Sequence, residues 1–289
     1  MLRTLTVTGR TSVIPLVGHP VERVKTPEPM NSWFAEHGVD AVVVPFDIRP
    51  ERVASFFEVL KATENCVGCT VTMPHKQAAF AASDVVSERA RRAKAVNIIR
   101  RAASGKLIGD MTDGLAMVAA LRQRGIEVRG RNAMVIGAGG AGTAIAHAVA
   151  EEGAASLVVI EPDQMRQRAL LVDIERCHPG LTVATRPLPD RPVDIAINAS
   201  PAGMLPHDPD PYPLELLPAA TVLADAITHP VVTRWLTEAA RRGARIQTGE
   251  EMALAQVPIL LRYLRFTGAD EARGPGSREP GARRKAAAR

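Results

Sequence analysis

The sequence predicts an α/β protein built from two domains. Apolar runs of strand length alternate with amphipathic or proline-initiated helices from Ser12 onwards, which is typical of a mostly parallel sheet covered by helices. Further along, a continuous apolar strand leads directly into a glycine-rich turn at 137–142 and then into a small-residue helix. The length of 289 residues, with 46% hydrophobic and 23% charged residues, suits a chain of about two domains.

The first region, residues 1–113, is predicted to form one sheet with its covering helices. Proline at a helix start and the helical spacing of Val53, Phe57 and Leu60 indicate two of these helices. The predicted strands are 12–18, 40–47, 67–72, 96–100 and 106–109, the last two forming a hairpin. The predicted helices are 27–38, 49–64 and one that begins at Pro74.

The glycine-rich turn has the properties of an anion-binding loop. Gly137 permits the sharp turn, Gly139 removes a side chain that would keep a diphosphate off the backbone, and Gly142 lets the helix pack closely on the strand. The helix start then offers unpaired N–H groups to the anion. The next apolar run, 156–160, ends in Glu161, where a carboxylate would meet an adenosine ribose. The pattern predicts a Rossmann-type dinucleotide-binding domain, and a strand–turn–helix unit without a ligand is the alternative.

The dinucleotide-binding domain is predicted to span 114–249. A helix at 114–124 enters it, and a final helix at 250–266 returns to the first domain, which therefore comprises 1–113 plus 250–267. The predicted strands are 133–137, 155–161, 181–186, 193–198 and 220–225. The predicted helices are 141–152, 163–176 and 230–242, and the proline-rich stretch 205–217 is predicted to be a loop.

The positive charge is concentrated at the C-terminus. The formal net charge is +5, and residues 273–289 alone carry six basic residues against one acidic residue, Glu279. Residues 268–289 contain little that can be buried, so we expect a disordered basic tail. Because the rest is close to neutral and has no basic stripe with interleaved aromatics, we expect no nucleic-acid partner for the folded part.

The sequence has no feature of an exported or membrane-embedded protein. No apolar run reaches the roughly 18 residues that a membrane span needs, and the first residues lack the apolar segment of a secretory signal. Three cysteines, Cys66, Cys69 and Cys177, do not describe a disulfide framework, and we expect them to be small buried residues. We therefore expect a cytoplasmic protein without a metal site.

Two polar clusters in the first region are candidates for chemistry. The first, Gly68 to Lys76, places a lysine just after Pro74, at the start of a predicted helix. The second, Gly109 to Gly114, places Asp113 at the junction of the two domains, where it would cap the crossing helix or enter the cleft. Since surface lysines and N-cap aspartates are common, each cluster alone is also compatible with a structural role.

Taken together, seven ordered segments resemble the shikimate/quinate dehydrogenase family. The similarity extends over about residues 13–266, in family order. The segments are Val17-Gly18-His19-Pro20 with Lys25-Thr26-Pro27, Thr70 to Lys76, Ala95-Val96-Asn97, Gly109 to Gly114, Gly137 to Ala141, Asn198 to Met204, and Gly249-x-x-Met252-x-x-x-Gln256.

The resemblance implies an enzyme that moves hydride between a nicotinamide and a ring hydroxyl of an alicyclic hydroxy acid. It implies Lys76 and Asp113 as the catalytic pair, and this agrees with chemistry, because oxidising an alcohol requires a proton acceptor within reach of its oxygen. The implied substrate-contacting residues are Val24, Thr26, Thr72, Asn97, Thr228 and Gln256. The implied cofactor-contacting residues are Gly137, Ala138, Gly139, Gly140, Ala141, Gly142, Glu161, Asp163, Asn198, Ser200, Ala226, Gly249 and Met252.

The chain departs from the family pattern around the substrate carboxylate. Similar shikimate enzymes usually carry serines in place of Val24 and Thr26, an asparagine in place of Thr70, and a tyrosine near Thr228. Val24 cannot donate a hydrogen bond, and a bond to a charged acceptor contributes roughly 1.5–3 kcal/mol. We therefore expect weaker binding of shikimate unless Arg23 or Lys25 replaces the lost donor.

The cofactor end departs as well. Members that prefer NADP usually have Asn-Arg-Thr where this chain has Glu161-Pro162-Asp163. A carboxylate accepts bonds from ribose hydroxyls and repels a 2′-phosphate, so we expect NAD to be favoured over NADP. Arg166 and Arg168 follow closely and could compensate in part.

Two further expectations concern the functional class of the protein and its oligomeric state. The rival to an enzyme is a non-catalytic regulatory protein that senses a dinucleotide or another ligand on the same fold. Retention of both Lys76 and Asp113 favours the enzyme, because a sensor has no need of a proton-transfer pair. We expect a monomer or homodimer whose partner is the small-molecule acid.

Overall fold

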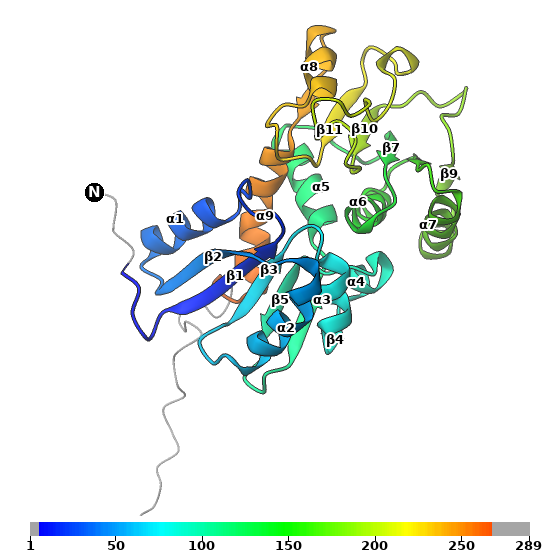
Figure 1. The fold of residues 1–289 in the computed structure, drawn as a ribbon. Coiled ribbons are helices and arrows are strands. Elements are labelled where there is room, and N and C mark those ends of the chain that lie inside the picture. The colour runs from blue at the N-terminus through cyan, green and yellow to red at the C-terminus, as the bar shows by residue number, and fades with distance from the viewer. Residues whose placement is uncertain (1–5, 268–289) are drawn as a thin grey trace, which may run out of the picture.

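The computed structural model describes residues 6–267 and contains two six-stranded sheets, each with its own helices (Figure 1). The expected two-part α/β fold is thus confirmed, and the expected basic tail, 268–289, lies outside the described residues. The first sheet has the strand order β2-β1-β3-β5-β6-β4. Its strands are β1 (Ser12–Gly18), β2 (Ala41–Asp47), β3 (Gly68–Val71), β4 (Val85–Val86), β5 (Ile98–Arg101) and β6 (Leu107–Asp110).

The first sheet is mixed because the β5–β6 hairpin reverses the chain. Strand β1 is parallel to β2 and β3, β5 is antiparallel to β3 and β6, and β4 is parallel to β6. The sheet is therefore less uniformly parallel than the sequence indicates. As a consequence, the ends of β1, β3 and β6 and the beginning of β5 all meet at one edge.

The helices of this half are α1 (Pro27–His37), α2 (Val53–Ala62), α3 (Lys76–Ala82) and α4 (Glu88–Ala93). They differ from the prediction in three places. Helix α3 begins at Lys76 rather than at Pro74. The single helix expected at 49–64 begins as a 3₁₀ turn, Pro50–Arg52, and becomes α-helical only from Val53. The short elements β4 and α4 are absent from the prediction, since two and six residues are too few to show a periodic pattern.

The second sheet is entirely parallel and has the order β12-β11-β10-β7-β8-β9. Its strands are β7 (Asn132–Ile136), β8 (Ser156–Ile160), β9 (Thr182–Ala184), β10 (Ile195–Asn198), β11 (Val222–Asp225) and β12 (Ile246–Gln247). Its helices are α6 (Gly140–Glu151), α7 (Gln164–Cys177) and α8 (Arg234–Arg241). The chain order reverses between β7 and β10, which is the point where parallel sheets of this kind bind ligands.

Three features of this half differ from the prediction. Helix α8 begins at Arg234 rather than at 230, because the Thr233 hydroxyl accepts the Leu236 N–H and caps the helix there. Strand β12 is an addition to the predicted strands, and the loop 205–217 contains one 3₁₀ turn, Leu214–Leu216.

Two helices connect the halves, α5 (Asp113–Gln123) and α9 (Gly249–Tyr263), and they pack on each other. Near its start, α9 buries Met252 and Ala255 in the apolar cluster formed with α5 and β7. Nearer its end, Leu260 and Leu261 pack with the core of the first sheet. Gly114 fixes α5 against α6, since a Cβ atom there would lie 2.2 Å from the Ala144 carbonyl oxygen.

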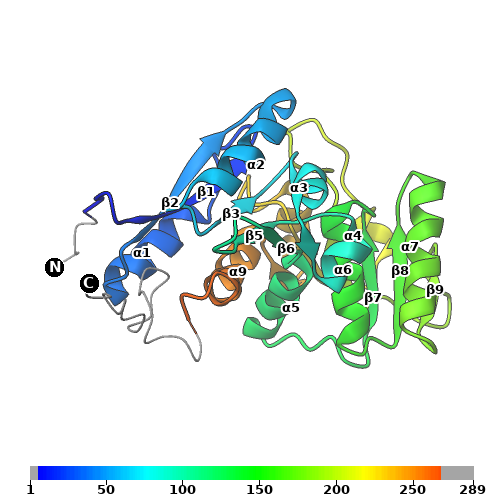
Figure 2. The same cartoon turned by 90° about the horizontal axis from the view of Figure 1, so that it is seen from below.

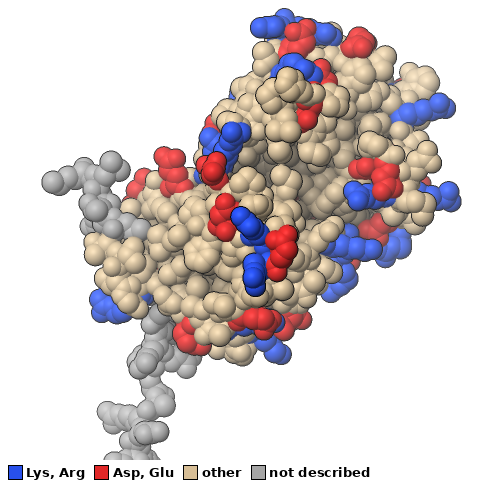
Figure 3. All heavy atoms as spheres, viewed as in Figure 1, with Lys and Arg blue, Asp and Glu red and all other residues tan. Residues whose placement is uncertain are grey.

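In Figure 3 much of the face is uncharged, and the charged side chains form separate groups that contain both signs. Surface ion pairs among the described residues include Arg234 with Asp210 and Arg122 with Glu152. None of the helices in residues 6–267 is long and apolar enough to cross a membrane. Cys66 and Cys69 are buried free thiols in the core of the first half, and burial raises the pKa of both.

Candidate active site

The candidate active site lies where four strand ends of the first sheet meet. Gly18 closes β1, Thr72 follows β3, Asn97 precedes β5, and Asp113 comes shortly after β6. Because β5 runs opposite to the other three, its beginning lies at the same edge as their ends. The topology therefore brings the polar residues Thr72, Asn97 and Asp113 together although they come from three separate segments of the chain.

Lys76 and Asp113 form the centre of this edge. Lys76 Nζ donates to Asp113 Oδ2 at 2.5 Å, Asn97 Nδ2 donates to Oδ1 at 2.6 Å, and Gln256 Nε2 donates to Oδ1 at 3.0 Å. Asp113 is 5% exposed, whereas the Lys76 side chain remains 24% exposed. The carboxylate is thus held by three donors, and the amine keeps access to the space outside.

Local packing fixes where Lys76 points. It is the first residue of α3, and its carbonyl oxygen accepts the Val96 N–H at 2.9 Å, which ties the helix start to the segment before β5. His75 is buried, and its Nε2 lies 2.5 Å from the Ile48 carbonyl oxygen. His75 therefore anchors the helix start rather than facing the cleft.

Thr112 belongs to the same hydrogen-bonded group, although it is not among the predicted site residues. Its N–H donates to Asn97 Oδ1 at 2.9 Å, and its hydroxyl oxygen accepts from Gln256 Nε2 at 3.2 Å. Its position just before Asp113 is the available sequence signal. Nearby Asp110 turns away and pairs with Arg89 at 2.6 Å, so the two aspartates of this segment have different surroundings.

The other predicted substrate residues lie outside this hydrogen-bonded group. Val24 is half-buried against the apolar cluster around Phe34, and Thr26 stands before α1 without a side-chain capping bond. Thr72 and Thr228 are half-buried, and Gly18 lets Thr72 approach, since a Cβ at Gly18 would lie 2.4 Å from Thr72 Cγ2.

Two neighbouring side chains, Lys25 and Thr70, affect how the carboxylate of an acid would be bound. Lys25 Nζ pairs with Glu250 Oε1 at 3.0 Å, so its charge is already matched by a carboxylate at the start of α9. The Thr70 hydroxyl is buried and has no hydrogen-bond partner among the described residues. An unpaired buried hydroxyl is unfavourable, so this oxygen suits a contact with a ligand.

The glycine-rich turn leaves room for a diphosphate at the start of α6. Gly137 has φ 103°, and a Cβ at Gly142 would lie 2.0 Å from the Gly137 carbonyl oxygen, so both positions require glycine. A Cβ at Gly139 would meet nothing within 4 Å, and Gly139 is exposed. Gly140 and Ala141 begin the helix, whose free N–H groups suit the phosphates of a dinucleotide.

Glu161 is held beside this turn at the end of β8. Its Oε2 accepts the Ala138 N–H at 2.7 Å, and its Oε1 accepts the Asp163 N–H at 3.1 Å. Asp163 caps α7 through Met165 and Arg166 N–H and pairs with the Arg166 side chain at 3.3 Å. The carboxylate of Glu161 therefore has a fixed place beside the glycine-rich turn.

The remaining predicted cofactor residues surround the same edge of the sheet. Asn198 donates to the Ala202 carbonyl oxygen and to Asp225, and its Oδ1 accepts from Ser200, so its side chain shapes the turn after β10. A Cβ at Gly137 would lie 3.0 Å from the Ser200 nitrogen, which places that turn next to the glycines. Ala226 is half-buried after β11, and Met252 is buried in α9. Gly249 packs against the Ile227 carbonyl oxygen.

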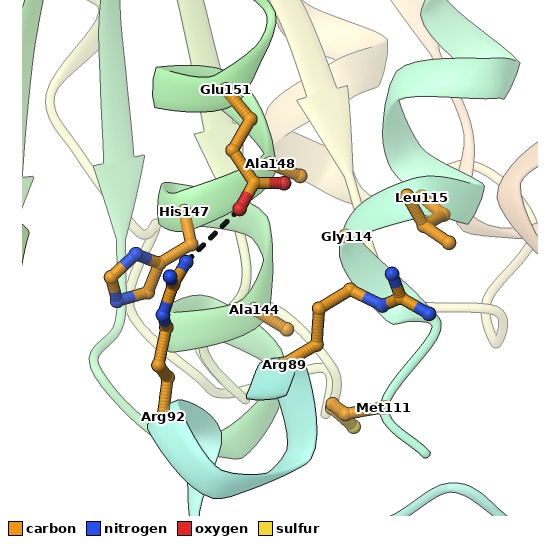
Figure 4. A pocket seen from close by; sticks show the side chains of 9 residues that line it. All are labelled: Arg89, Arg92, Met111, Gly114, Leu115, Ala144, His147, Ala148 and Glu151. Carbon is orange, nitrogen blue, oxygen red and sulfur yellow. Dashed lines mark hydrogen bonds and ion pairs between the residues drawn. The ribbon is translucent and has the colours of Figure 1, made fainter. Parts of the chain in front are cut away.

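A hollow lies between the halves, beside the candidate site. It is bounded by α4, α5 and α6 (Figure 4), and its lining is mainly apolar around Met111, Leu115 and Ala144. At its side, Arg92 Nη1 of α4 pairs with Glu151 Oε1 of α6 at 3.0 Å. The hollow does not include Lys76 or Asp113. Within residues 6–267, no group of three or more His, Cys, Asp or Glu side chains is arranged to hold a metal ion.

Comparison with known proteins assigns this arrangement to a family. The family model described as the shikimate dehydrogenase substrate binding domain matches residues 16–99. A shikimate dehydrogenase (NADP(+)) of Symbiobacterium thermophilum is 35% identical over 274 residues, which cover 90% of this chain and 91% of the relative. The chain belongs to the shikimate dehydrogenase family. The suspected family membership is thereby confirmed.

Solved structures agree with the assignment. Shikimate 5-dehydrogenase from Thermus thermophilus, in complex with NADP(H) and shikimate, is 30% identical, has a TM-score of 0.78, and covers 89% of this chain and 94% of its own. The 5-ketofructose reductase of Gluconobacter sp. strain CHM43 is 29% identical with the same TM-score, covering 92% and 96%. The shikimate dehydrogenase family fold therefore extends over almost the whole described chain.

Proposed function

We propose that this protein is an NAD(P)-dependent oxidoreductase that interconverts a ring hydroxyl and a ketone of a shikimate- or quinate-like alicyclic hydroxy acid. The observation that carries the proposal is the contact between Lys76 Nζ and Asp113 Oδ2 at 2.5 Å, with the amine still partly exposed. A regulatory sensor would need the cleft but not a buried carboxylate that orients an accessible amine. We also propose the domain division at 113/114 and 249/250.

Lys76 would exchange the proton of the reacting hydroxyl. In the oxidation direction, its neutral amine accepts the hydroxyl proton, and in ketone reduction its ammonium group returns that proton to the oxygen. The nicotinamide, when bound, supplies or accepts the hydride. Asp113 holds Nζ in position, Asn97 and Gln256 hold Asp113, and both amides would contact neighbouring ring hydroxyls.

We propose that NAD is favoured over NADP, with NADP as the alternative. The Glu161 carboxylate is fixed by two backbone N–H groups at the position where the ribose hydroxyls would lie. A 2′-phosphate there would meet a like charge. Arg166, the cation closest in sequence, pairs with Asp163 and is exposed, which limits its help to a phosphate. The relatives named as NADP(+) enzymes favour the alternative, and the ratio of kcat/KM for NAD and NADP decides between the two cofactors.

The acid group of the substrate would be held less tightly than by paired serine hydroxyls. Val24 offers no donor, and the charge of Lys25 is matched by Glu250. Thr26, which makes no capping bond, and Thr70, whose hydroxyl has no partner within residues 6–267, are the groups that could contribute. We therefore propose an acid that differs from shikimate near its carboxylate, with Thr72 and Thr228 contacting the ring.

One assay tests the function. Purified protein is incubated with NAD or NADP and with shikimate, quinate and related ring acids, and with 5-ketofructose plus the reduced cofactors, while absorbance of the reduced cofactor is followed. The expected result is turnover of at least one ring acid, with a higher kcat/KM for NAD. Dinucleotide binding without turnover of any compound would favour the sensor, and turnover of 5-ketofructose alone would replace the acid by a neutral ketose.

A further inference from the structure

Lys94 ends α4 in a backbone conformation that lysine rarely adopts. Its φ and ψ are 47° and 37°, in the left-handed region, and its N–H closes the helix on the Ala90 and Arg91 carbonyl oxygens. Glycine fills such helix ends without a steric penalty, whereas a residue with a Cβ atom is strained there. Strained backbone conformations occur preferentially at ligand-binding sites, which suggests a functional role for the lysine at this position.

The position of Lys94 places it next to the glycine-rich turn. The following residue, Ala95, is fully buried, and a Cβ atom on Gly140 would lie 2.7 Å from Ala95 Cβ. Gly140 is the first residue of α6, and α4 packs on α6 (Figure 2). Lys94 itself is exposed, so its long, flexible side chain starts one residue away from the point where the first half touches the phosphate-binding helix start.

The charge of Lys94 also sets it apart from its neighbours on α4. Arg89 pairs with Asp110 at 2.6 Å, Arg92 pairs with Glu151 at 3.0 Å, and Arg91 pairs with Glu88. Lys94 has no carboxylate within 4 Å in the part of the chain that the structure describes. The turn 137–142 carries no charged side chain of its own. A diphosphate at this turn would therefore receive no cation from the turn itself.

We propose that Lys94 binds the diphosphate of the dinucleotide from the substrate side of the cleft. The proposal rests on the proposed function, since it concerns the cofactor of that same site. An ammonium group at the N-terminus of α6 adds charge-assisted hydrogen bonds to those of the backbone N–H groups. It would also make cofactor affinity depend on how closely α4 lies against α6.

The test separates the charge of Lys94 from its strained backbone. Lys94→Gly removes both, Lys94→Gln removes only the charge, and Lys94→Arg keeps the charge. The matched control is Arg265→Gly, because Arg265 is the other non-glycine residue with positive φ among the described residues, at 66°, and follows the far end of α9. Each protein is titrated with NADH and ADP-ribose by fluorescence or calorimetry at low and high salt, and its melting temperature is recorded.

The expected result is a rise of roughly tenfold in Kd for NADH and ADP-ribose in Lys94→Gly and Lys94→Gln, with most of the difference lost in high salt. Lys94→Arg should bind within about threefold of the unaltered protein. Both glycine variants should melt at the same or a higher temperature, which would separate affinity from stability. Arg265→Gly should keep its affinity.

Two results would overturn the proposal. Equal affinity of Lys94→Gly, Lys94→Gln and the unaltered protein would remove Lys94 from the site while leaving the proposed function intact. Equal losses in Lys94→Gln and Lys94→Arg would show that charge is not the cause. If the unaltered protein bound neither NADH nor NADPH, the proposed function would fail together with this inference.

Discussion

Asp113 in the first half and Asp225 in the second are both buried near the edge of a sheet, but the two carboxylates have different surroundings. Asp113, in the first half, is matched by a cation, Lys76, and by the amides of Asn97 and Gln256. Asp225, at the end of β11, is fully buried and accepts only from neutral donors, the Ile227 N–H, the Thr233 hydroxyl and the Asn198 amide. Burial raises the pKa of Asp225 to about 6, and these bonds offset the effect only in part.

Under the proposed function, the difference is the one between a carboxylate that positions a proton-transfer group and a structural carboxylate. Both residues are buried and well hydrogen-bonded, so burial alone does not identify a catalytic group. Asp113 holds an amine that is 24% exposed, and this amine can exchange a proton with a ligand. Asp225 ties the ends of β10 and β11 to the start of α8 and has no cationic partner among its hydrogen-bond donors in residues 6–267.

The largest expected effect is on catalysis at the first carboxylate. Lys76→Ala should lower kcat by ~10² or more, because it removes the positioned proton donor and acceptor. Its effect on the Kd of the dinucleotide should be small. The control is Lys61→Ala, which removes a half-buried lysine paired with Glu58 and should leave kcat unchanged. Steady-state kinetics would show the prediction to be wrong if Lys76→Ala kept full activity.

The second carboxylate should affect stability rather than turnover. The pKa of Asp225 is higher in the folded protein than in the unfolded chain. Its contribution to the free energy of unfolding is therefore complete below about pH 4 and is lost as the pH rises through about 6. Asp225→Asn removes the buried charge and keeps an acceptor for Ile227 and Asn198. It should raise the free energy of unfolding at pH 7.5 by up to roughly 3 kcal/mol, since a pKa raised by one corresponds to about 1.4 kcal/mol.

Urea denaturation at pH 4 and pH 7.5 measures this effect. The free energy of unfolding that Asp225→Asn gains over the unaltered protein should be smaller at pH 4. At that pH, Asp225 is protonated in the folded protein. An equal difference at the two pH values would show that Asp225 does not titrate in this range. Activity at pH 7.5 should stay within about twofold, in contrast to Lys76→Ala.

A third carboxylate, Glu161, should control the choice of cofactor. Replacing Glu161-Pro162-Asp163 by Asn-Arg-Thr should shift the ratio of kcat/KM towards NADP by roughly tenfold or more, because a repelling charge is exchanged for an attracting one. The ratio in the unaltered protein is the decisive measurement. A tenfold preference for NADP there would contradict the argument and would indicate that Arg166 or Arg168 reaches the phosphate.

The smallest expected effect concerns the substrate acid. Val24→Ser should improve kcat/KM for shikimate by up to roughly tenfold, since it restores one donor to a carboxylate. Val21→Ser, on the same connection, serves as the control for a general loosening of the loop and should give no gain. Efficient turnover of shikimate by the unaltered protein, equal to that of every other acid tested, would show that the Val24 substitution is silent.

The sequence predicts local features better than it predicts the active site. The turn at Gly137 and the following helix depend on neighbouring residues, and the structure has them where they are expected. The contact of Lys76 with Asp113 depends on the β5–β6 hairpin, which brings the end of β6 to the edge where α3 begins. No spacing in the sequence gives that distance, and the pairing of the two residues follows only from the resemblance to a family.

Other features escape prediction for definite physical reasons. Helix α4 has six residues, so its sequence shows no repeated apolar spacing, and the backbone strain at Lys94 leaves no trace in the residue type. The pairing of Lys25 with Glu250 joins segments more than 200 positions apart. The apolar pattern places helix α8 four residues too early, because the start is set by the Thr233 cap rather than by that pattern.

The contact of Gly114 with the Ala144 carbonyl oxygen ties the position of Asp113 to that of α6. Asp113 is the first residue of α5 and Gly114 the second, so the carboxylate lies as close to α6 as the missing side chain at position 114 allows. Since α6 begins at the glycine-rich turn, this one helix contact sets the spacing between the turn and the carboxylate. A methyl group at position 114 would push α5 away from α6, and Asp113 would move with it relative to Lys76 on α3.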